Sequence, residues 1–426
     1  MRESENLLEN TLPAKSEVVL KAGLLALSSG MGAYRVKRVM QNIAGALRID
    51  NQAHVTLTEI NSTCMDGEKY CTKVATLETV GVNSDRITRI GQLTQKLKSK
   101  SIKHSVRYIN DELISIEGVP LLYSNLNTGI FAGLACLSFA FLLGGDLCEM
   151  VLAFFGAFFG QVVRRIMLIR HMNQFVTTVV AVVVALLMYL FVSLVALKCG
   201  FGHAREISGY IASLLFIIPG FPLATGGLDL AKLDFSSGIQ RICYAAAIIW
   251  CGAATGSSLV QAFGICPDST TFSLQNFSNS EDMIKLVLFF VFSFVGVLGF
   301  ALMFNSVPIV AFTSALIGAF ANTFRIILAV LGVSPFISTT TAAILVGILA
   351  SVLVEWFDFT RITLSVPAIV IMVPGSFLFY GSYEAITGNL ILSLQNESQA
   401  LLRLLALPVG LSIARFLTDK NWRVDE

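Results

Sequence analysis

The sequence predicts a membrane protein that is mainly α-helical: a small soluble α/β domain followed by ten transmembrane helices arranged as a 5+5 inverted-topology repeat. Of the 426 residues, 55% are hydrophobic and only 14% are charged, whereas soluble domains carry about 25% charged residues. The charge is unevenly placed, since 29 of the 58 Asp, Glu, Lys and Arg residues fall in the first 120 positions. Two similar Pro-Gly segments also recur in the apolar part. The chain therefore has two regions that suit different solvents.

Residues 1–123 are predicted to form a cytoplasmic α/β domain. The stretch 17–49 has the apolar spacing of helices, interrupted at Gly30 and Gly32. The runs "AHVTLTEI" and "KYCTKVATLETV" carry β-branched residues typical of strands. The segment "SDRITRIGQLTQKLKS" then repeats apolar residues at helical spacing, and Ser84 is its expected N-cap.

From about residue 125 onward, the chain holds apolar stretches long enough to cross about 30 Å of hydrocarbon. We expect ten spans, five in residues 124–265 and five in residues 282–418. They are placed at Thr128–Leu143, Leu147–Val163, Phe175–Leu197, Ile207–Leu228, Ile239–Gly264, Met283–Phe304, Val307–Val333, Phe336–Val354, Ile362–Tyr380 and Ala400–Leu417.

Lysine and arginine in short loops predict the orientation of these spans. With the first domain in the cytoplasm, nine basic residues fall on the inside and three on the outside. The inside set is Arg164, Arg165, Arg170, Lys232, Arg241, Arg361, Arg415, Lys420 and Arg423, and the outside set is Lys198, Arg205 and Lys285. We therefore expect a multi-pass protein of the cell membrane, here a bacterial inner membrane, with both termini in the cytoplasm.

The two halves of the apolar region resemble each other. "IIPGFPLATGGLDL" returns 155 positions later as "MVPGSFLFYGSYEAI", which aligns the two Pro-Gly pairs, Gly226 with Gly381, and Asp229 with Glu384. Two further echoes precede this segment in the same order. Because each unit has five spans, the second copy must enter the membrane in the opposite sense, as in many secondary transporters.

The Pro-Gly pairs are the predicted substrate site. Pro219-Gly220 and Pro374-Gly375 each lie about 18 Å along a span, near mid-membrane. Proline removes a backbone donor and glycine permits an unwound turn, so free N–H and C=O groups can face a cavity. The alternative is a packing kink whose freed groups are satisfied by neighbouring helices.

Polar residues close to these pairs are the other candidates. Thr225, Ser376 and Tyr380 are expected to hydrogen-bond the substrate, although such residues also serve helix packing. Asp229 and Glu384 are predicted as proton-coupling carboxylates, with an interfacial position at helix ends as the alternative.

A second group of polar residues lies inside the predicted spans. For Arg325 and Glu149 the alternative to a functional role is a position at the membrane interface. Paired hydroxyls could line a polar path or bond back to their own helices; they belong to Thr177, Thr178, Ser338 and Thr339.

Several classes of site and partner lack a signal. The eight cysteines form no CxxC pair and the four histidines show no ligand spacing, so we expect no cofactor and no metal. The net charge of +2 gives no reason to expect a nucleic-acid partner. The expected partners are a small-molecule substrate, protons and the lipid bilayer, and a homo-oligomer stays open.

The paired "IPG" and "VPG" segments, "LLGGD" and "GLLALSSGMGAYRVKRVM" resemble the threonine/serine exporter family in its single-chain form, with both membrane halves fused. The resemblance implies ten spans, a cytosolic N-terminal domain likened to hydrolases, and efflux of threonine and serine driven by the proton motive force. A related two-protein form is associated with succinate export, so C4-dicarboxylates are the alternative substrates.

Two other function classes were weighed against the exporter. A membrane hydrolase or peptidase would use the N-terminal domain or the two span carboxylates, but the chain lacks GxSxG, P-loop and GxGxxG motifs. A passive channel would conduct without coupling. We expect an exporter rather than an enzyme, because an inverted repeat with two central breaks suits alternating access.

Overall fold

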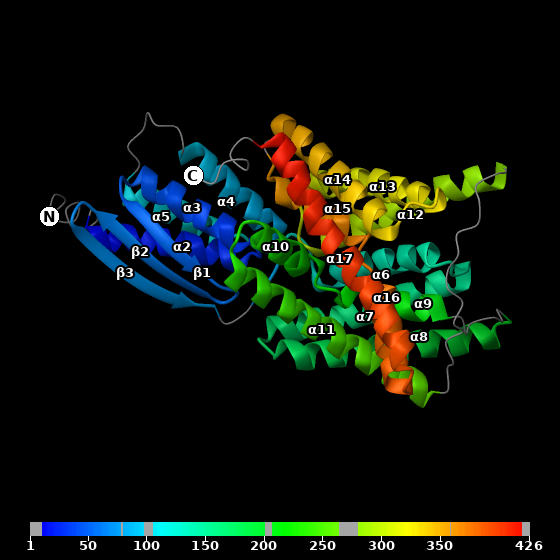
Figure 1. The fold of residues 1–426 in the computed structure, drawn as a ribbon. Helices are drawn as coiled ribbons and strands as arrows, with labels where there is room; N and C mark the ends of the chain where they lie inside the picture. The colour runs from blue at the N-terminus through cyan, green and yellow to red at the C-terminus, as the bar shows by residue number, and fades with distance from the viewer. Residues whose placement is uncertain are drawn as a thin grey trace. The chain divides into compact units, whose positions relative to one another are not determined.

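The computed structural model describes six stretches of the chain, residues 11–77, 80–97, 105–200, 207–263, 280–357 and 359–419. It divides the chain into two compact units (Figure 1). The first unit comprises Met1–Leu122, Phe221–Cys243 and Val354–Thr363, and the second comprises Tyr123–Gly220, Tyr244–Leu353 and Leu364–Glu426. The first unit thus takes two later segments in addition to the N-terminal part. The predicted limits of the two membrane repeats stay predictions.

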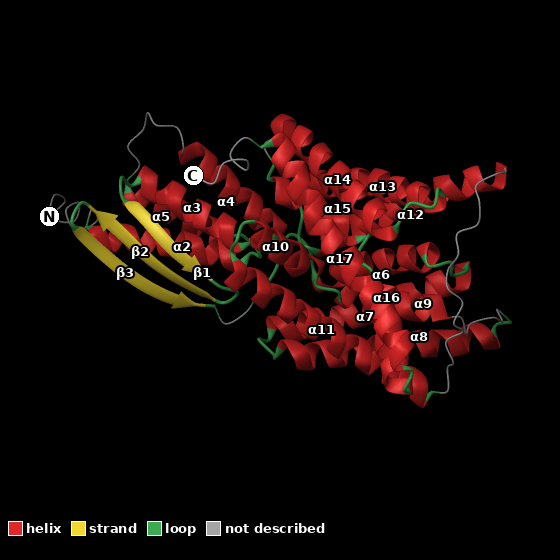
Figure 2. Ribbon diagram, viewed as in Figure 1, coloured by secondary structure: helices red, strands yellow, loops and turns green. Residues whose placement is uncertain are grey.

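The first unit contains a three-stranded antiparallel sheet in the order β1-β2-β3, formed by β1 (Asp50–Val55), β2 (Glu59–Asp66) and β3 (Lys69–Thr76) (Figure 2). Its residues alternate between buried and partly exposed along β2, as expected when one face of a sheet is covered. The covering helices are α2 (Leu12–Ser28) and α3 (Ala33–Ala46). The predicted run "AHVTLTEI" spans the turn between β1 and β2, where Glu59 N donates to Thr56 Oγ1 at 3.0 Å.

Local residues explain where the helices of this unit end. Gly30 has φ +96°, a left-handed conformation that glycine adopts without strain, and it separates α2 from α3 as predicted. Helix α4 (Ser84–Leu97) buries the apolar residues of the predicted helical repeat, which are Ile87, Ile90, Leu93 and Leu97. Its cap lies one residue earlier than predicted, because Asn83 Oδ1 accepts from Arg86 N at 3.1 Å. Helix α5 (Val106–Glu117) completes the N-terminal part, with Ser105 as its N-cap.

The rest of the described chain is helical. The helices are α6 (Asn125–Leu142), α7 (Leu147–Ile169), α8 (Gln174–Lys198), α9 (Ile207–Ala212), the short 3-10 helix η1 (Leu215–Ile217), α10 (Gly220–Ala231), α11 (Phe235–Ala262), α12 (Ser280–Met303), α13 (Pro308–Val330), α14 (Pro335–Phe357), α15 (Arg361–Val370), α16 (Gly375–Thr387) and α17 (Leu390–Thr418). In the second unit, α6 packs against both α7 and α12, and α16 packs against α17.

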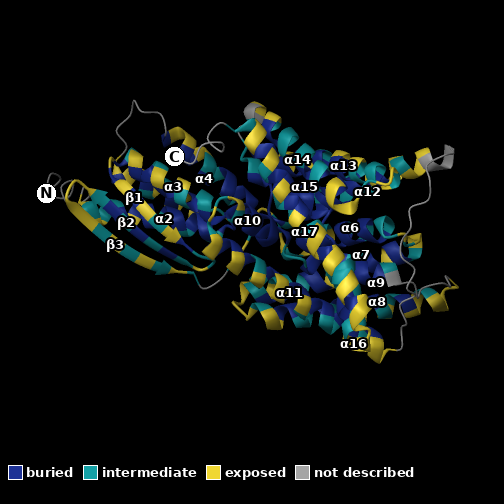
Figure 3. Cartoon of the chain, in the orientation of Figure 1, coloured by how far each residue is buried: buried dark blue, intermediate teal, exposed yellow. Residues whose placement is uncertain are grey.

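This is a multi-pass membrane protein. Within the described residues, eight helices are long and apolar enough to cross a bilayer, and two bent helix pairs would bring the number to ten. Exposed residues lie along these helices (Figure 3), and many of them are large and apolar. Phe191, Leu194 and Phe320, for example, are 57–60% exposed. A surface of this kind is unfavourable in water and suits lipid. The predicted count of ten and the 5+5 repeat stay predictions.

Candidate substrate site at two helix breaks

The first break lies between η1 and α10. The helices on either side of it, Ser208–Ile217 and Gly220–Ala231, meet at a bend of 62°. Pro219 lacks a backbone N–H and cannot continue a regular helical hydrogen-bond ladder. Gly220 N instead donates to Ile218 O at 2.8 Å, which closes a tight turn around the proline.

The second break has the same local structure. Helices α15 and α16 meet at a bend of 48°. Gly375 N donates to Val373 O at 2.8 Å, and Pro374 has φ −79° and ψ 57°, the angles of an inverse γ-turn. Both Pro-Gly pairs therefore end one helix and start the next in the same way.

The two breaks pack against each other within the second unit. A Cβ added to Gly220 would lie 2.8 Å from Val370 Cγ2. One added to Gly375 would meet Ile218 first and would lie 2.7 Å from Leu215 Cδ2. Leu215 and Val370 are 155 positions apart, as are Gly220 and Gly375. Exchanging the two halves thus exchanges the two contacts, which is the pattern of a local twofold axis. The four residues predicted as the core of the site lie together.

A backbone carbonyl at the first break is satisfied by a charged side chain. Arg164 Nη1 on α7 donates to Phe216 O at 3.1 Å. The charge pattern predicts Arg164 only as a marker of topology, just beyond a span that ends at Val163. Its neighbour Arg165 donates to Asn125 Oδ1 and Tyr123 O, at 3.0 and 2.8 Å. Both arginines therefore lie within α7, and their guanidinium groups are hydrogen-bonded to oxygens of other segments.

The other predicted substrate residues are divided between the two units. Ser376 and Tyr380 follow the second break on α16 and are half-buried. Thr225 belongs to the first unit, where its hydroxyl donates back to Phe221 O at 2.9 Å. Back-bonding of this kind was the alternative to a substrate contact. A substrate role for these three residues stays a prediction.

The two predicted coupling carboxylates lie in different environments. Asp229 is completely buried in the first unit, where Ser237, Arg241 and the backbone of α3 contact it. Glu384 is half-buried at the end of α16 and accepts a hydrogen bond from Asn389 Nδ2 at 3.0 Å. Their shared position in the sequence repeat therefore does not extend to shared contacts.

The sequence does not predict the buried contacts of two charged residues. Glu149 on α7 is 1% exposed, and its carboxylate accepts from Ser208 Oγ at 2.6 Å and from Gly209 N at 3.4 Å. Arg241 on α11 is 1% exposed, whereas its charge predicts a position on the inside of the membrane. An ionisable residue inside an apolar run was the only signal for either, and it does not name the partner.

Most of the remaining polar candidates have partners near them in sequence or on a neighbouring helix, whereas the buried hydroxyls of Thr177 and Thr339 have no hydrogen-bond partner among the described residues. Arg325 Nε donates to Asn322 Oδ1 at 3.0 Å, and Asn322 Nδ2 donates to Ser293 Oγ at 2.8 Å. Thr178 and Ser338 donate back to carbonyls of their own helices, at 2.8 and 3.2 Å. This is the packing alternative considered for the paired hydroxyls.

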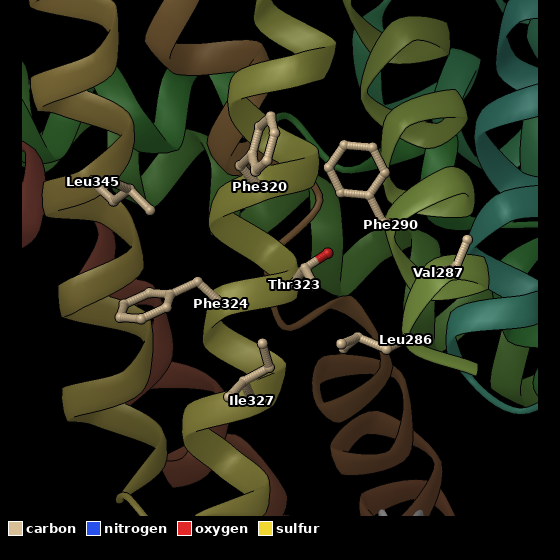
Figure 4. Close-up of a pocket in the computed structure, with 8 residues that line it drawn as sticks. All are labelled: Leu286, Val287, Phe290, Phe320, Thr323, Phe324, Ile327 and Leu345. Atoms are coloured by element: carbon tan, nitrogen blue, oxygen red, sulfur yellow. The ribbon is translucent and has the colours of Figure 1, made fainter. Parts of the chain in front are cut away.

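An apolar groove of about 410 Å³ lies among α12, α13 and α14 (Figure 4). Leucine, isoleucine, valine and phenylalanine line it, with Thr323 as its only hydroxyl. A zwitterionic amino acid would lose its hydration there without gaining charged or hydrogen-bonding partners. This groove therefore does not suit such a substrate.

Comparison with known proteins agrees with this architecture. A family model described as "Putative threonine/serine exporter" matches residues 17–264, and one described as "Threonine/Serine exporter, ThrE" matches residues 289–417. The chain belongs to the threonine/serine exporter family. Both membrane halves of the exporter are thus fused in one chain, as the sequence motifs predicted.

One protein similar to this chain is named for a different substrate. The "Probable succinate transporter subunit YjjP" of Escherichia coli (strain K12) is 22% identical over 229 residues, which cover 54% of this chain and 86% of YjjP. No solved structure matches the chain.

Adding a side chain at either glycine of the two breaks should destabilise the fold. We expect Gly375→Val and Gly220→Val each to lower the free energy of unfolding by about 1–3 kcal/mol through overpacking. Thermal unfolding of the purified protein measures the effect. Gly45→Ala is the control, because a Cβ there meets nothing within 4 Å. Unchanged stability in both valine variants would contradict the close contact at the breaks.

Proposed function

We propose that this protein exports threonine and serine from the cytoplasm and that the proton motive force drives the export. The observation that carries the proposal is the reciprocal contact between the two Pro-Gly breaks, in a chain that belongs to this family. Irregular backbone is tolerated at membrane depth where it is buried in protein or lines a cavity, and transporters use it to bind polar substrates.

The half-helices that follow the breaks offer a carboxylate site. The first N–H groups of a helix have no partner in the helix itself, and the helix dipole favours an anion there. Helix α16 starts with Gly375, Ser376 and Phe377. The Gly375 N–H already donates to Val373 O, so the backbone donors of its first turn are those of Ser376 and Phe377. Helix α10 has Pro222 as its third residue and lacks one of them. We propose that α16 binds the carboxylate, with Ser376 and Tyr380 within reach of a substrate hydroxyl.

Succinate is the second candidate substrate, suggested by the name of the relative YjjP. A C4-dicarboxylate would need two anion sites, and the two half-helix N-termini would have to supply both. The proline in the first turn of α10 makes that end the weaker one. This difference favours an amino acid, which carries a single carboxylate.

The proposal includes alternating access by a 5+5 inverted repeat. Relative rocking of two five-helix halves would open the site to one side of the membrane at a time. Both termini would lie in the cytoplasm, and the membrane would be a bacterial inner membrane. Asp229 and Glu384 are the proposed coupling carboxylates, and Asp229→Asn and Glu384→Gln test them.

Flux measurements test the proposal directly. Vesicles containing the purified protein would be loaded with labelled threonine, serine or succinate, and retention would be followed with and without a protonophore. We expect threonine and serine to leave faster than succinate, and collapse of the proton gradient to slow their exit. Flux that is indifferent to the gradient would refute coupling, and faster succinate exit would change the substrate.

A further inference from the structure

The first unit contains a buried ion pair whose contacts the proposed coupling role of Asp229 does not explain. Arg241 Nε on α11 lies 3.3 Å from Asp229 Oδ2 on α10, and the side chains are 1% and 0% exposed. A buried pair of this kind is tolerated only when hydrogen bonds satisfy its remaining atoms. The hydrogen-bond partners of those atoms show which segments of the chain the ion pair connects.

The carboxylate of Asp229 caps helix α3 from outside that helix. Ala33 N donates to Oδ2 at 2.9 Å and Tyr34 N donates to Oδ1 at 3.4 Å. These are the first two residues of α3, where backbone donors are otherwise unpaired and negative charge is favourable. The N-cap residue Gly32 supplies no capping side chain, and a Cβ there would lie 2.6 Å from Asp229 Oδ1. Glycine at this position gives the carboxylate its access.

The guanidinium of Arg241 reaches the same part of the chain. Its Nη2 donates to Met31 O at 2.8 Å, directly before α3. Its Nε donates to Ser237 Oγ at 3.1 Å, and that hydroxyl donates to Asp229 Oδ2 at 3.1 Å. A planar fork with several donors suits a site that must bind a carboxylate and a carbonyl together. Arg241 therefore joins α10, α11 and the start of α3.

Two further polar contacts join the same segments of this unit. Lys37 on α3 forms an ion pair with Asp234 in the turn between α10 and α11. Leu57 N, between β1 and β2, donates to Gln240 Oε1 on α11 at 3.0 Å. The polar contacts thus extend from the buried pair to the surface along one junction.

We propose that Arg241 is a positioning residue that holds α10 to α3 through Asp229, so that α10 and the N-terminal helices move as one body during export. The inference rests on the proposed function. Helix α10 begins at Gly220, the residue after Pro219, so a restraint on α10 also restrains the chain that leaves the first break. The family model that matches residues 17–264 includes both sides of the junction.

A chemical cross-link between α3 and the turn after α10 tests this arrangement. Cysteines would replace Lys37 and Asp234, in a background where the exposed Cys199 and Cys243 are serine. A short bifunctional thiol reagent then locks the junction in the full-length protein in vesicles. We expect the locked K37C/D234C protein to export labelled threonine within about twofold of its untreated form. Arrest of export by the lock would overturn the proposal.

The lock also separates positioning from other roles of the pair. Arg241→Met should reduce export by about tenfold, because a buried Asp229 without its cation no longer holds α3. Adding the lock to R241M should restore most of the lost rate. A direct role in proton transfer or in substrate binding would not be rescued by a remote cross-link, so failure of rescue also contradicts the proposal.

Amide hydrogen exchange tests the junction without any transport assay. The N–H groups of Ala33 and Tyr34 donate to Asp229 and should be protected in the wild-type protein. Their exchange should become about tenfold faster in R241M and slow again when the lock is added. If the wild type exports neither threonine, serine nor succinate, the proposed function fails. Amide hydrogen exchange then still shows whether Arg241 holds α10 to α3. Unchanged protection in R241M would overturn this positioning role.

Discussion

Replacing Arg241 with methionine is expected to lower the free energy of unfolding by about 3–5 kcal/mol, the usual cost of leaving one buried charge without its partner. Methionine fills the space of the arginine stem but supplies no donor to Asp229, Ser237 or Met31 O. Chemical denaturation of the purified protein in detergent measures the loss. Lys73→Met is the control, because Glu17 in the Lys73–Glu17 pair is 75% exposed and the pair is expected to contribute below about 1 kcal/mol.

The double variant D229N/R241M sharpens this prediction. Asparagine at position 229 keeps an oxygen that can accept from Ala33 N, and no net charge then remains buried. We therefore expect the double variant to be more stable than R241M alone, which makes the two effects strongly non-additive. Additive losses would indicate that the two residues act independently, in conflict with their 3.3 Å contact.

The spans were predictable because hydrocarbon thickness imposes a length and a composition on each helix. Each predicted span corresponds to one helix or to one bent pair of the structure. The ends were less predictable. Helix α7 runs six residues beyond the predicted Val163, to Ile169. Arg164 and Arg165 read as loop residues because they are charged, but carbonyl and amide oxygens within the protein accept their hydrogen bonds.

The paired breaks were predictable from the sequence, whereas the polar junction was not. Proline and glycine act on the local backbone, so their effect is visible in a short sequence window. The partners of Asp229 and Arg241 lie 196 and 210 positions away, at Ala33 and Met31. No periodicity or capping rule connects residues at such separations. Tertiary packing alone explains why a carboxylate predicted for coupling caps a helix of the first unit.

Replacing both Pro219 and Pro374 with alanine is expected to abolish export. Alanine restores a backbone N–H and frees φ, so each turn closed by the Gly220 and Gly375 N–H groups must compete with a continuous helix. A straightened helix would pair the backbone groups that we propose bind substrate. We expect the rate of threonine efflux from vesicles to fall by at least about tenfold, because catalytic or binding geometry tolerates little displacement.

The single variants and two cysteine controls distinguish a specific role of the breaks from a general sensitivity of export to changes in these helices. P374A should reduce export more than P219A, because the proposed carboxylate site lies at the start of α16, directly after Pro374. Cys243→Ser and Cys251→Ser, which lie on α11, should change export by less than about twofold, as substitutions away from the breaks. A cysteine effect equal to that of the prolines would mean that export responds to any change in these helices. In that case the breaks would be packing kinks, and the substrate would have to bind elsewhere.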